Sequence, residues 1–206
     1  MQGAQASLAE ADAQAGLSVA QRGRREAIVA KTIELLATRE PAQIHMREIA
    51  AEAGVALATL YRYFPSKELL YAHAVAAWGK SFAPMTRSQA GKAGCDAERI
   101  RGALRRTAKA YQRWPNFYRL ILFLEITEDR EAGKVYQAFS TQYQGLLATV
   151  LEDTEPEDAT LAAEILLSSL GSALRKWSLG QWTIEQVLDH IDRAVTLVFG
   201  QPRPRT

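Results

Sequence analysis

The side chains that most often carry catalysis are few in this sequence and lie far apart. His45, His73 and His190 have no metal-binding neighbour at helical spacing. Cys95 is the only cysteine, which excludes an intrachain disulfide and the usual zinc sites. No glycine-rich phosphate loop follows a strand pattern, and Ser66 suits a helix cap better than an activated nucleophile. These observations argue against an enzyme and predict no metal and no cofactor.

Basic side chains, by contrast, are concentrated near the N-terminus. Between Gln21 and Lys67 eight Arg and Lys residues stand against five Glu residues, although the formal net charge of the whole chain is only +2. This local surplus of three (8 − 5) lends modest support to a phosphate-binding surface. Arg47 is the best candidate for a base contact, because a guanidinium can donate to both acceptors of guanine. The cluster at 22–25 is either a basic arm against a DNA backbone or solvated charge at a frayed helix start.

Two short helices joined by a tight turn must position this arginine. The first runs from Met46 to Ala53 and stops at Gly54, a residue that readily adopts the left-handed conformation of a helix end. The second runs from about Ala56 to Phe64, where Pro65 ends it and Ser66 caps the next helix. This spacing predicts a helix-turn-helix, whose second helix enters the major groove of DNA. The alternative is that the same pattern forms plain core in an all-helical protein.

Residues Val55 to Lys67, VALATLYRYFPSK, resemble the signature of the TetR family of transcriptional regulators. The likeness covers about Arg22 to Leu70, and this region loosely resembles the steroid-catabolism repressors of the family. The resemblance implies that Tyr61 touches bases or thymine methyl groups. It further implies that Thr59, Tyr63 and Lys67 hold phosphates, whereas Arg62 does either. The family positions that face DNA match Ala58, Thr59, Tyr61, Arg62, Tyr63 and Lys67.

The sequence departs from the family pattern at the front of the second helix. Ala56, Leu57 and Ala58 stand where many members have a serine, a polar residue and a glycine. The missing serine removes an N-cap worth about 1 kcal/mol, together with polar side chains that could read bases. The departure leaves the expected fold intact and the operator sequence open.

The whole chain has the pattern of an all-α protein, with an N-terminal three-helix helix-turn-helix domain and a C-terminal helical bundle for ligand binding and dimerisation. We expect a flexible tail over 1–20, a DNA-binding domain over 21–66, a ligand-binding and dimerisation domain over 67–200 and a second tail over 201–206. No apolar run reaches the roughly 20 residues of a membrane span, and the first twenty residues lack a secretory signal. We therefore expect a cytoplasmic protein without a membrane partner.

Helix-start signals divide the C-terminal part. Asp96 is the expected N-cap of a helix that follows a loop over 85–96. Thr154 with Glu157 and Thr183 with Gln186 form expected capping boxes for the last two helices. The helix from Asp96 carries many arginines, which form either a solvated face or, for one or two of them, a contact to an acidic group of a ligand.

Aromatic residues are unusually frequent between the fourth helix and the long helix over about 129–151. They either pack the core or wall a pocket in which a few hydroxyls orient a ligand. The family resemblance implies a small-molecule effector in this bundle, and hence the pocket. The predicted pocket residues are Trp78, Phe82, Tyr111, Trp114, Phe117, Phe123, Tyr136, Phe139 and Tyr143.

The last two helices carry long apolar stripes that serve either as an association surface or as intrachain core. The resemblance implies a homodimer through a four-helix bundle, which sets two recognition helices on successive major-groove faces. The predicted interface residues are Leu170, Leu174, Trp177, Leu188, Ile191 and Val195.

Together these features predict a one-component regulator, in the form of a repressor that binds a palindromic double-stranded operator as a homodimer. A small apolar or amphipathic effector is expected to release it. The competing prediction is an all-helical small-molecule or lipid-binding module that does not bind DNA.

Overall fold

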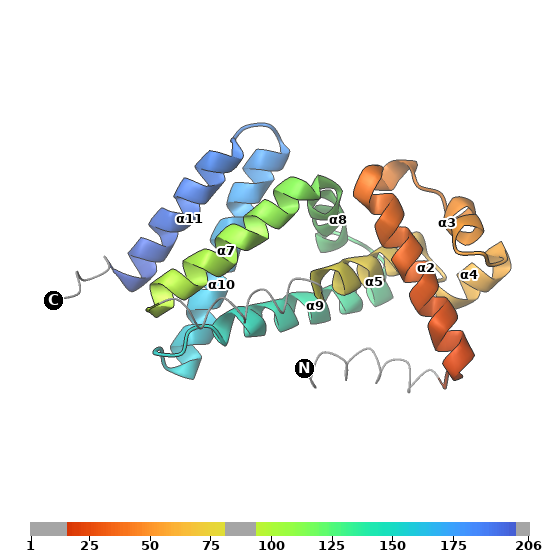
Figure 1. Ribbon diagram of the computed structural model, residues 1–206, viewed down its shortest axis with the longest axis horizontal. Helices are drawn as coiled ribbons and strands as arrows, with labels where there is room; N and C mark the ends of the chain where they lie inside the picture. Colours follow the sequence, from red (N-terminus) through yellow and green to blue (C-terminus); the bar gives the residue numbers. More distant parts are fainter. Residues whose placement is uncertain (1–15, 81–93, 201–206) are drawn as a thin grey trace. The chain divides into compact units, whose positions relative to one another are not determined.

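The computed structural model describes residues 16–80 and 94–200, and every regular element in those ranges is a helix (Figure 1). The all-α prediction is therefore confirmed for this part of the chain. Both predicted tails, apart from residues 16–20, most of the predicted loop over 85–96, and Phe82 lie outside the described residues.

The chain divides into two compact units. The first comprises Met1–Ser81 together with Phe123–Tyr136, and the second comprises Phe82–Leu122 with Gln137–Thr206. The boundary expected between residues 66 and 67 does not coincide with this division, because the helix that begins at Lys67 packs against the first helix of the same unit.

The first unit is built on α2 (Val19–Thr38) and α5 (Lys67–Lys80), which pack against each other. Between them in sequence come the short η1 (Pro41–Gln43), then α3 (Met46–Glu52) and α4 (Leu57–Tyr63). Helix α3 packs on both α2 and α4. The fully buried core of the unit is apolar and comes from all four helices, with Ile28, Leu36, Ile49, Leu60, Phe64, Leu70 and Val75.

Helix α2 begins earlier than the sequence indicated. Ser18 is its N-cap and forms a capping box with Gln21, in which the Gln21 N–H donates to the serine hydroxyl at 3.3 Å and the Ser18 N–H donates to the Gln21 side chain at 2.7 Å. The expected tail over 1–20 was therefore wrong for residues 18–20, because two polar side chains satisfy backbone groups at this end.

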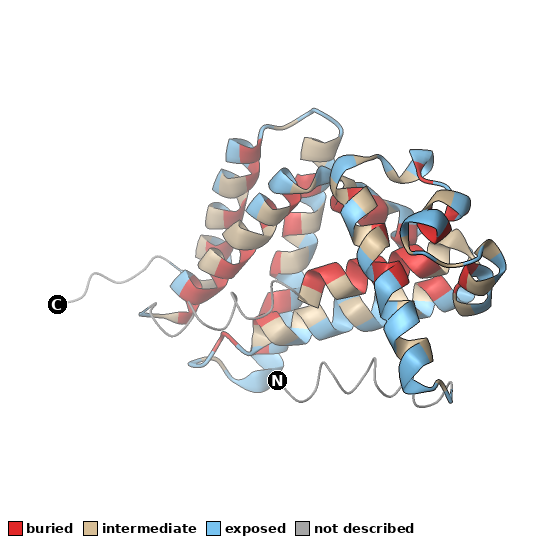
Figure 2. Cartoon of the chain, turned by 45° about the vertical axis from the view of Figure 1, so that its right-hand side comes forward, coloured by how far each residue is buried: buried red, intermediate tan, exposed pale blue. Residues whose placement is uncertain are grey.

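The second unit is built on α7 (Asp96–Arg113), α10 (Pro156–Ser178) and α11 (Ile184–Phe199), each of which packs on the other two. In Figure 1 these three helices lie side by side. Helices α8 (Pro115–Glu125) and α9 (Arg130–Ala148) each continue from one unit into the other. Figure 2 shows the buried residues along the inner sides of the helices and exposed residues along their outer sides.

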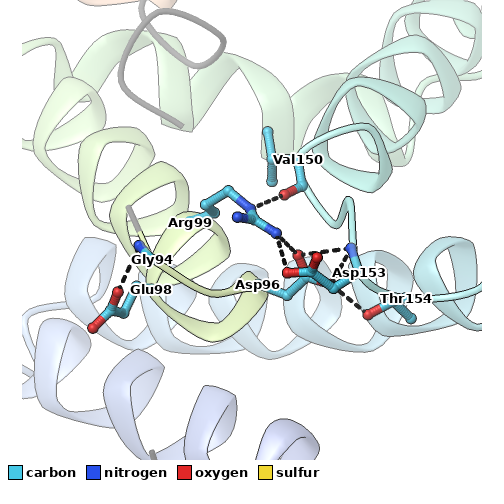
Figure 3. Close-up of polar contacts among 7 residues, drawn as sticks. All are labelled: Gly94, Asp96, Glu98, Arg99, Val150, Asp153 and Thr154. Carbon is cyan, nitrogen blue, oxygen red and sulfur yellow. Dashed lines mark hydrogen bonds and ion pairs between the residues drawn. The ribbon is translucent and has the colours of Figure 1, made fainter. Parts of the chain in front are cut away.

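A buried charged cluster joins the start of α7 to the turn between α9 and α10 (Figure 3). The Arg99 guanidinium donates to the Val150 carbonyl at 2.8 Å and to the Asp153 carboxylate at 2.7 Å, and it pairs with Asp96. Asp96 also accepts bonds from the Thr154 hydroxyl at 2.6 Å and the Asp153 N–H at 3.1 Å. Burial alone would raise the pKa of Asp96, but the bonds from Thr154, Arg99 and Asp153 together lower it.

This cluster overturns two of the capping predictions. Cys95, rather than Asp96, is the N-cap residue of α7, because the Asp96 carboxylate binds Arg99 and Thr154 instead. The Thr154 hydroxyl is thereby removed from α10, whose N-cap is Glu155, and the box with Glu157 does not form. The other predicted box, at the start of α11, is confirmed. None of the helices in the described ranges has the length and apolar character of a membrane span.

Candidate nucleic-acid interface

The turn between α3 and α4 has the geometry expected from its glycine. Gly54 has φ +64°, and its N–H donates to the Ala51 carbonyl at 3.1 Å. The Val55 N–H donates to the Ala50 carbonyl at 2.9 Å, which closes the end of α3. Ala56 is the N-cap of α4 and has no side-chain oxygen for capping. The helix-turn-helix is therefore positioned by backbone bonds and by packing from behind.

The predicted DNA-facing residues lie on the outer side of this motif. Arg47, Ala58, Tyr61 and Arg62 are exposed, whereas Thr59, Tyr63 and Lys67 are half-buried. Tyr61 leaves 46% of its surface exposed, which is high for a tyrosine in a short helix. No predicted residue of the set is buried in the core.

An open hollow of about 990 Å³ brings part of this set together. Of the predicted residues it is lined by Arg47, Tyr61 and Lys67, while Ala58, Thr59, Arg62 and Tyr63 are not part of its lining. Its walls come from α3, the front of α4 and the start of α5. The complete lining is Ile44, His45, Met46, Arg47, Glu48, Ala51, Leu57, Tyr61, Pro65, Ser66 and Lys67.

Two of the predicted phosphate contacts have polar groups in poorly solvated surroundings. The Lys67 ammonium lies 5.2 Å from the centre of the Tyr71 ring, and burial lowers the pKa of Lys67. The Tyr63 hydroxyl is buried and makes no hydrogen bond with any described residue. An unsatisfied polar group of this kind is rare in native structures. An anion bound here would compensate both groups.

Ser66 links the end of the recognition helix to the start of α9. Its hydroxyl accepts a bond from the Leu69 N–H at 3.0 Å, which confirms it as the cap of α5, and it donates to the Asp129 carboxylate. Asp129 in turn caps α9 by accepting from the N–H groups of Glu131 at 2.9 Å and Ala132 at 3.0 Å. The bond from Ser66 is the main cause that lowers the pKa of Asp129. All of these residues belong to the first unit.

A buried histidine behind the recognition helix was not anticipated from the sequence. The Arg25 guanidinium donates to His73 Nε2 at 2.8 Å and lies 5.2 Å from the centre of the Phe64 ring. Burial, followed by the charges of Arg25 and Lys80, lowers the pKa of His73 to about 3, so this imidazole is neutral. Arg25 is therefore held against the core of the unit, and of the basic cluster at 22–25 only Arg24 is fully exposed.

The predicted pocket aromatics are divided between the two units. Trp78, Phe123 and Tyr136 belong to the first unit; Trp78 is buried, and Phe123 leaves 44% of its surface exposed. The Tyr136 hydroxyl donates to Glu125 at 3.3 Å. Phe117, in the second unit, is only 1% exposed and is a core side chain.

Within the second unit the remaining aromatics form two ring pairs. Tyr111 meets Tyr118 edge to face at 5.2 Å, and the Tyr118 hydroxyl donates to the Gly171 carbonyl at 2.8 Å. Phe139 and Tyr143 stack at 6.3 Å, and the Tyr143 hydroxyl hydrogen-bonds to Thr107. Trp114, also predicted to line the pocket, is half-buried at the end of α7.

Four of the predicted interface residues are buried within the chain itself. Leu170, Leu174, Ile191 and Val195 are each at most 2% exposed, so they form the core between α10 and α11 rather than a surface. Trp177 and Leu188 are half-buried. The exposed apolar residues at this end of the chain are others, namely Leu161, Ile165, Leu179, Leu197 and Val198. The spacing of Leu161 and Ile165 at i, i+4, off the buried stripe, is the signal that could have identified them.

Comparison with known proteins agrees with this architecture. Residues 28–74 match the model of bacterial regulatory proteins of the tetR family. The chain is 28% identical over 184 residues to the HTH-type transcriptional repressor KstR of Rhodococcus jostii, a match that covers 89% of this chain and 86% of the relative. A TetR transcriptional regulator from Rhodococcus sp. RHA1 has a similar structure, with a TM-score of 0.69 and 27% identity over 87% of this chain and 97% of that one. FadR of Bacillus subtilis, in complex with stearoyl-CoA, superposes with a TM-score of 0.65 and 18% identity over 86% of this chain and 99% of that one.

Proposed function

The chain belongs to the TetR family of bacterial regulators, and on that premise we propose that it is a one-component transcriptional repressor. As a homodimer it binds a palindromic double-stranded operator, and a small apolar or amphipathic effector releases it. The observation that carries this proposal is the hollow on the helix-turn-helix, around which Arg47, Tyr61 and Lys67 are gathered. The similarity to a protein named as a repressor favours repression over activation. The protein acts in the cytoplasm, where bacterial operators are.

The operator contacts divide into base reading and backbone binding. Arg47 is exposed at the start of α3 and reads guanine through two parallel hydrogen bonds. Lys67, Tyr63 and Thr59 bind phosphates, which fix the register of the protein on the duplex but carry no sequence information. A phosphate beside Lys67 would favour the charged amine, whose pKa burial lowers.

The homodimer forms through the outer faces of α10 and α11. Leu161 and Ile165 are 55% and 48% exposed on α10, and Leu197 is 87% exposed on α11. Exposed leucines and isoleucines at helical spacing are typical of an association surface. A two-fold dimer repeats one recognition helix per half-site, which requires an inverted repeat in the operator.

We assign the effector site to the second unit. Helices α7 and α9 contribute the hydrogen-bonded Thr107 and Tyr143, and the Tyr143 ring stacks on Phe139. Burial lowers the pKa of Arg106 and raises the pKa of the neighbouring Tyr143, so both groups lie in poorly solvated surroundings. A half-buried guanidinium near aromatic rings suits an amphipathic ligand with an acidic group. The stearoyl-CoA complex of the structurally similar FadR supports this class of effector.

The effector signal reaches DNA through α9. This helix carries Phe139 and Tyr143 in the second unit, and its N-cap Asp129 is hydrogen-bonded to Ser66 at the end of the recognition helix. A helix transmits displacement along its axis because bending it breaks its own hydrogen bonds. By linkage, DNA then weakens effector binding by the factor by which the effector weakens DNA binding.

A mobility-shift assay with the intergenic region upstream of the protein's own gene tests the proposal. In excess non-specific competitor we expect a discrete shift, which Arg47→Ala weakens by about 1–3 kcal/mol while leaving binding to random DNA nearly unchanged. Native mass spectrometry of the purified protein would identify a bound effector, and adding that compound should reverse the shift.

A folded protein that shifts neither this region nor any genomic fragment would overturn the repressor proposal. The chain would then be an all-helical small-molecule or lipid-binding module. Equal losses on operator and random DNA for Arg47→Ala would mean that Arg47 holds a phosphate.

A further inference from the structure

The base-reading surface of this chain is unusually apolar around its one guanidinium. Beside Arg47, the hollow on the helix-turn-helix is lined by Ala51 from α3 and by Leu57 and Tyr61 from α4. Ala51 and Tyr61 are exposed, and Leu57 is half-buried. Ala58, next along α4, is exposed as well. The front of the recognition helix therefore offers methyl groups and an aromatic ring where polar side chains would make directional hydrogen bonds.

Charge around this surface limits what can occupy it. Arg47 and Lys67 line the same hollow, and Arg62 is exposed on the same short helix. Glu48 is the single acid in the lining, and it pairs with Arg39. Cations around an apolar floor favour a polyanion that also presents apolar groups. In the major groove of DNA the apolar group on a base edge is the 5-methyl of thymine.

We propose that Leu57, Ala58, Tyr61 and Ala51 form a thymine-methyl reading surface, so that each operator half-site is specified by a guanine for Arg47 flanked by thymines whose methyl groups this surface buries. The inference rests on the proposed function and adds to it the chemistry of the sequence that is read. The Tyr61 ring, rather than its hydroxyl, makes the contact.

Single-atom changes in the DNA test this without altering base pairing. Once footprinting has located the operator, each thymine in a half-site is replaced in turn by deoxyuridine, which removes only the methyl group. Fluorescence anisotropy at constant salt should show about a three- to fivefold loss of affinity at the contacted positions, the value for burying one methyl-sized group. At the same positions a C·G pair should bind poorly, and 5-methylcytosine should recover about the same factor. A 7-deazaguanine at the guanine read by Arg47 should weaken binding independently.

Protein variants assign the methyl contacts to side chains. Leu57→Ala and Tyr61→Ala should each abolish the deoxyuridine effect at one position, whereas Tyr61→Phe should keep it. If Leu57→Ala fails to fold by circular dichroism, the exposed Ala58→Ser serves in its place.

The possible results separate the two levels of the proposal. Specific operator binding with no loss at any deoxyuridine overturns the methyl-reading surface and leaves the repressor intact. A deoxyuridine effect that persists unchanged in every variant assigns it to DNA shape and also overturns the surface. Absence of any specific operator binding overturns the repressor itself.

Discussion

Replacing Arg99 by methionine tests how the second unit is held together. In the folded chain its guanidinium donates to the Val150 carbonyl, Asp96 and Asp153, and Arg99 is only 7% exposed. Methionine fills much of the arginine stem but donates nothing. Asp96, itself 6% exposed, would keep the bonds from Thr154 and the Asp153 N–H but lose its neutralising charge.

The expected cost follows from which partner is left behind. Removing one member of a buried ion pair destabilises a protein by about 3–5 kcal/mol. The Asp153 side chain is 70% exposed, so its share is that of a surface pair, about 0–1 kcal/mol. Asp96 keeps two donors, which places the expected loss near the lower end, about 3 kcal/mol.

The loss should also depend on pH. The hydrogen bonds hold the pKa of Asp96 below that of an unfolded aspartate, so its contribution to stability is present above about pH 4 and disappears as the pH falls through the lowered folded value. In Arg99→Met the pKa of Asp96 rises, because the buried carboxylate has lost its cation. The difference between wild type and variant should therefore shrink as the pH is lowered from 7 towards 4.

Urea unfolding followed by circular dichroism, at one fixed protein concentration, measures these differences. The matched control is Arg101→Met on the same helix. That arginine is half-buried and pairs with Asp192 at 3.6 Å, so its loss should cost less than about 1 kcal/mol. Equal costs for the two variants, or a difference that does not change with pH, would refute the reasoning.

Three further expectations concern the proposed regulator. Lys67→Ala should weaken operator and random DNA alike and make the salt slope shallower by about 0.9; an unchanged slope in a salt titration would exclude a phosphate contact. Ser66→Ala removes the cap of α5 and the bond to Asp129, so it should lower the free energy of unfolding by about 1 kcal/mol or more and reduce the response to the effector in the mobility shift; Thr160→Ala, on the exposed side of α10, is the control. Leu161→Asp should give a folded monomer in sedimentation that no longer shifts operator DNA, and a normal dimer would place the interface elsewhere.

The helix-turn-helix could be predicted because its signals are local. Gly54 sets the turn, and Ser66 caps the next helix through a residue three positions away. Each works through backbone groups within a few residues, so the sequence order alone contains the interaction. The same rules failed at Asp96 and Thr154, because partners more than 50 residues apart along the chain bound the capping side chains.

The apolar stripes of the last two helices show a different limit. A stripe indicates which side of a helix avoids water but not what covers it. Leu170, Leu174 and Ile191 are covered within the chain, so the dimer prediction placed its residues on the wrong face of these helices. Likewise, nothing in the spacing of Arg25 and His73, 48 residues apart, indicated that they would meet behind the recognition helix.

That meeting bears on how the recognition helix is controlled. Helix α4 has seven residues and no side-chain N-cap, and a helix of this length is not stable by itself in water. Its position is set instead by Phe64, which is fully buried, meets the His73 ring of α5 edge to face at 5.6 Å and lies beneath Arg25 of α2. The reading surface therefore follows α5, because α4 has little rigidity of its own. Since the cap of α5 is hydrogen-bonded to the cap of α9, a small displacement at the start of α9 is enough to move the side chains that read DNA.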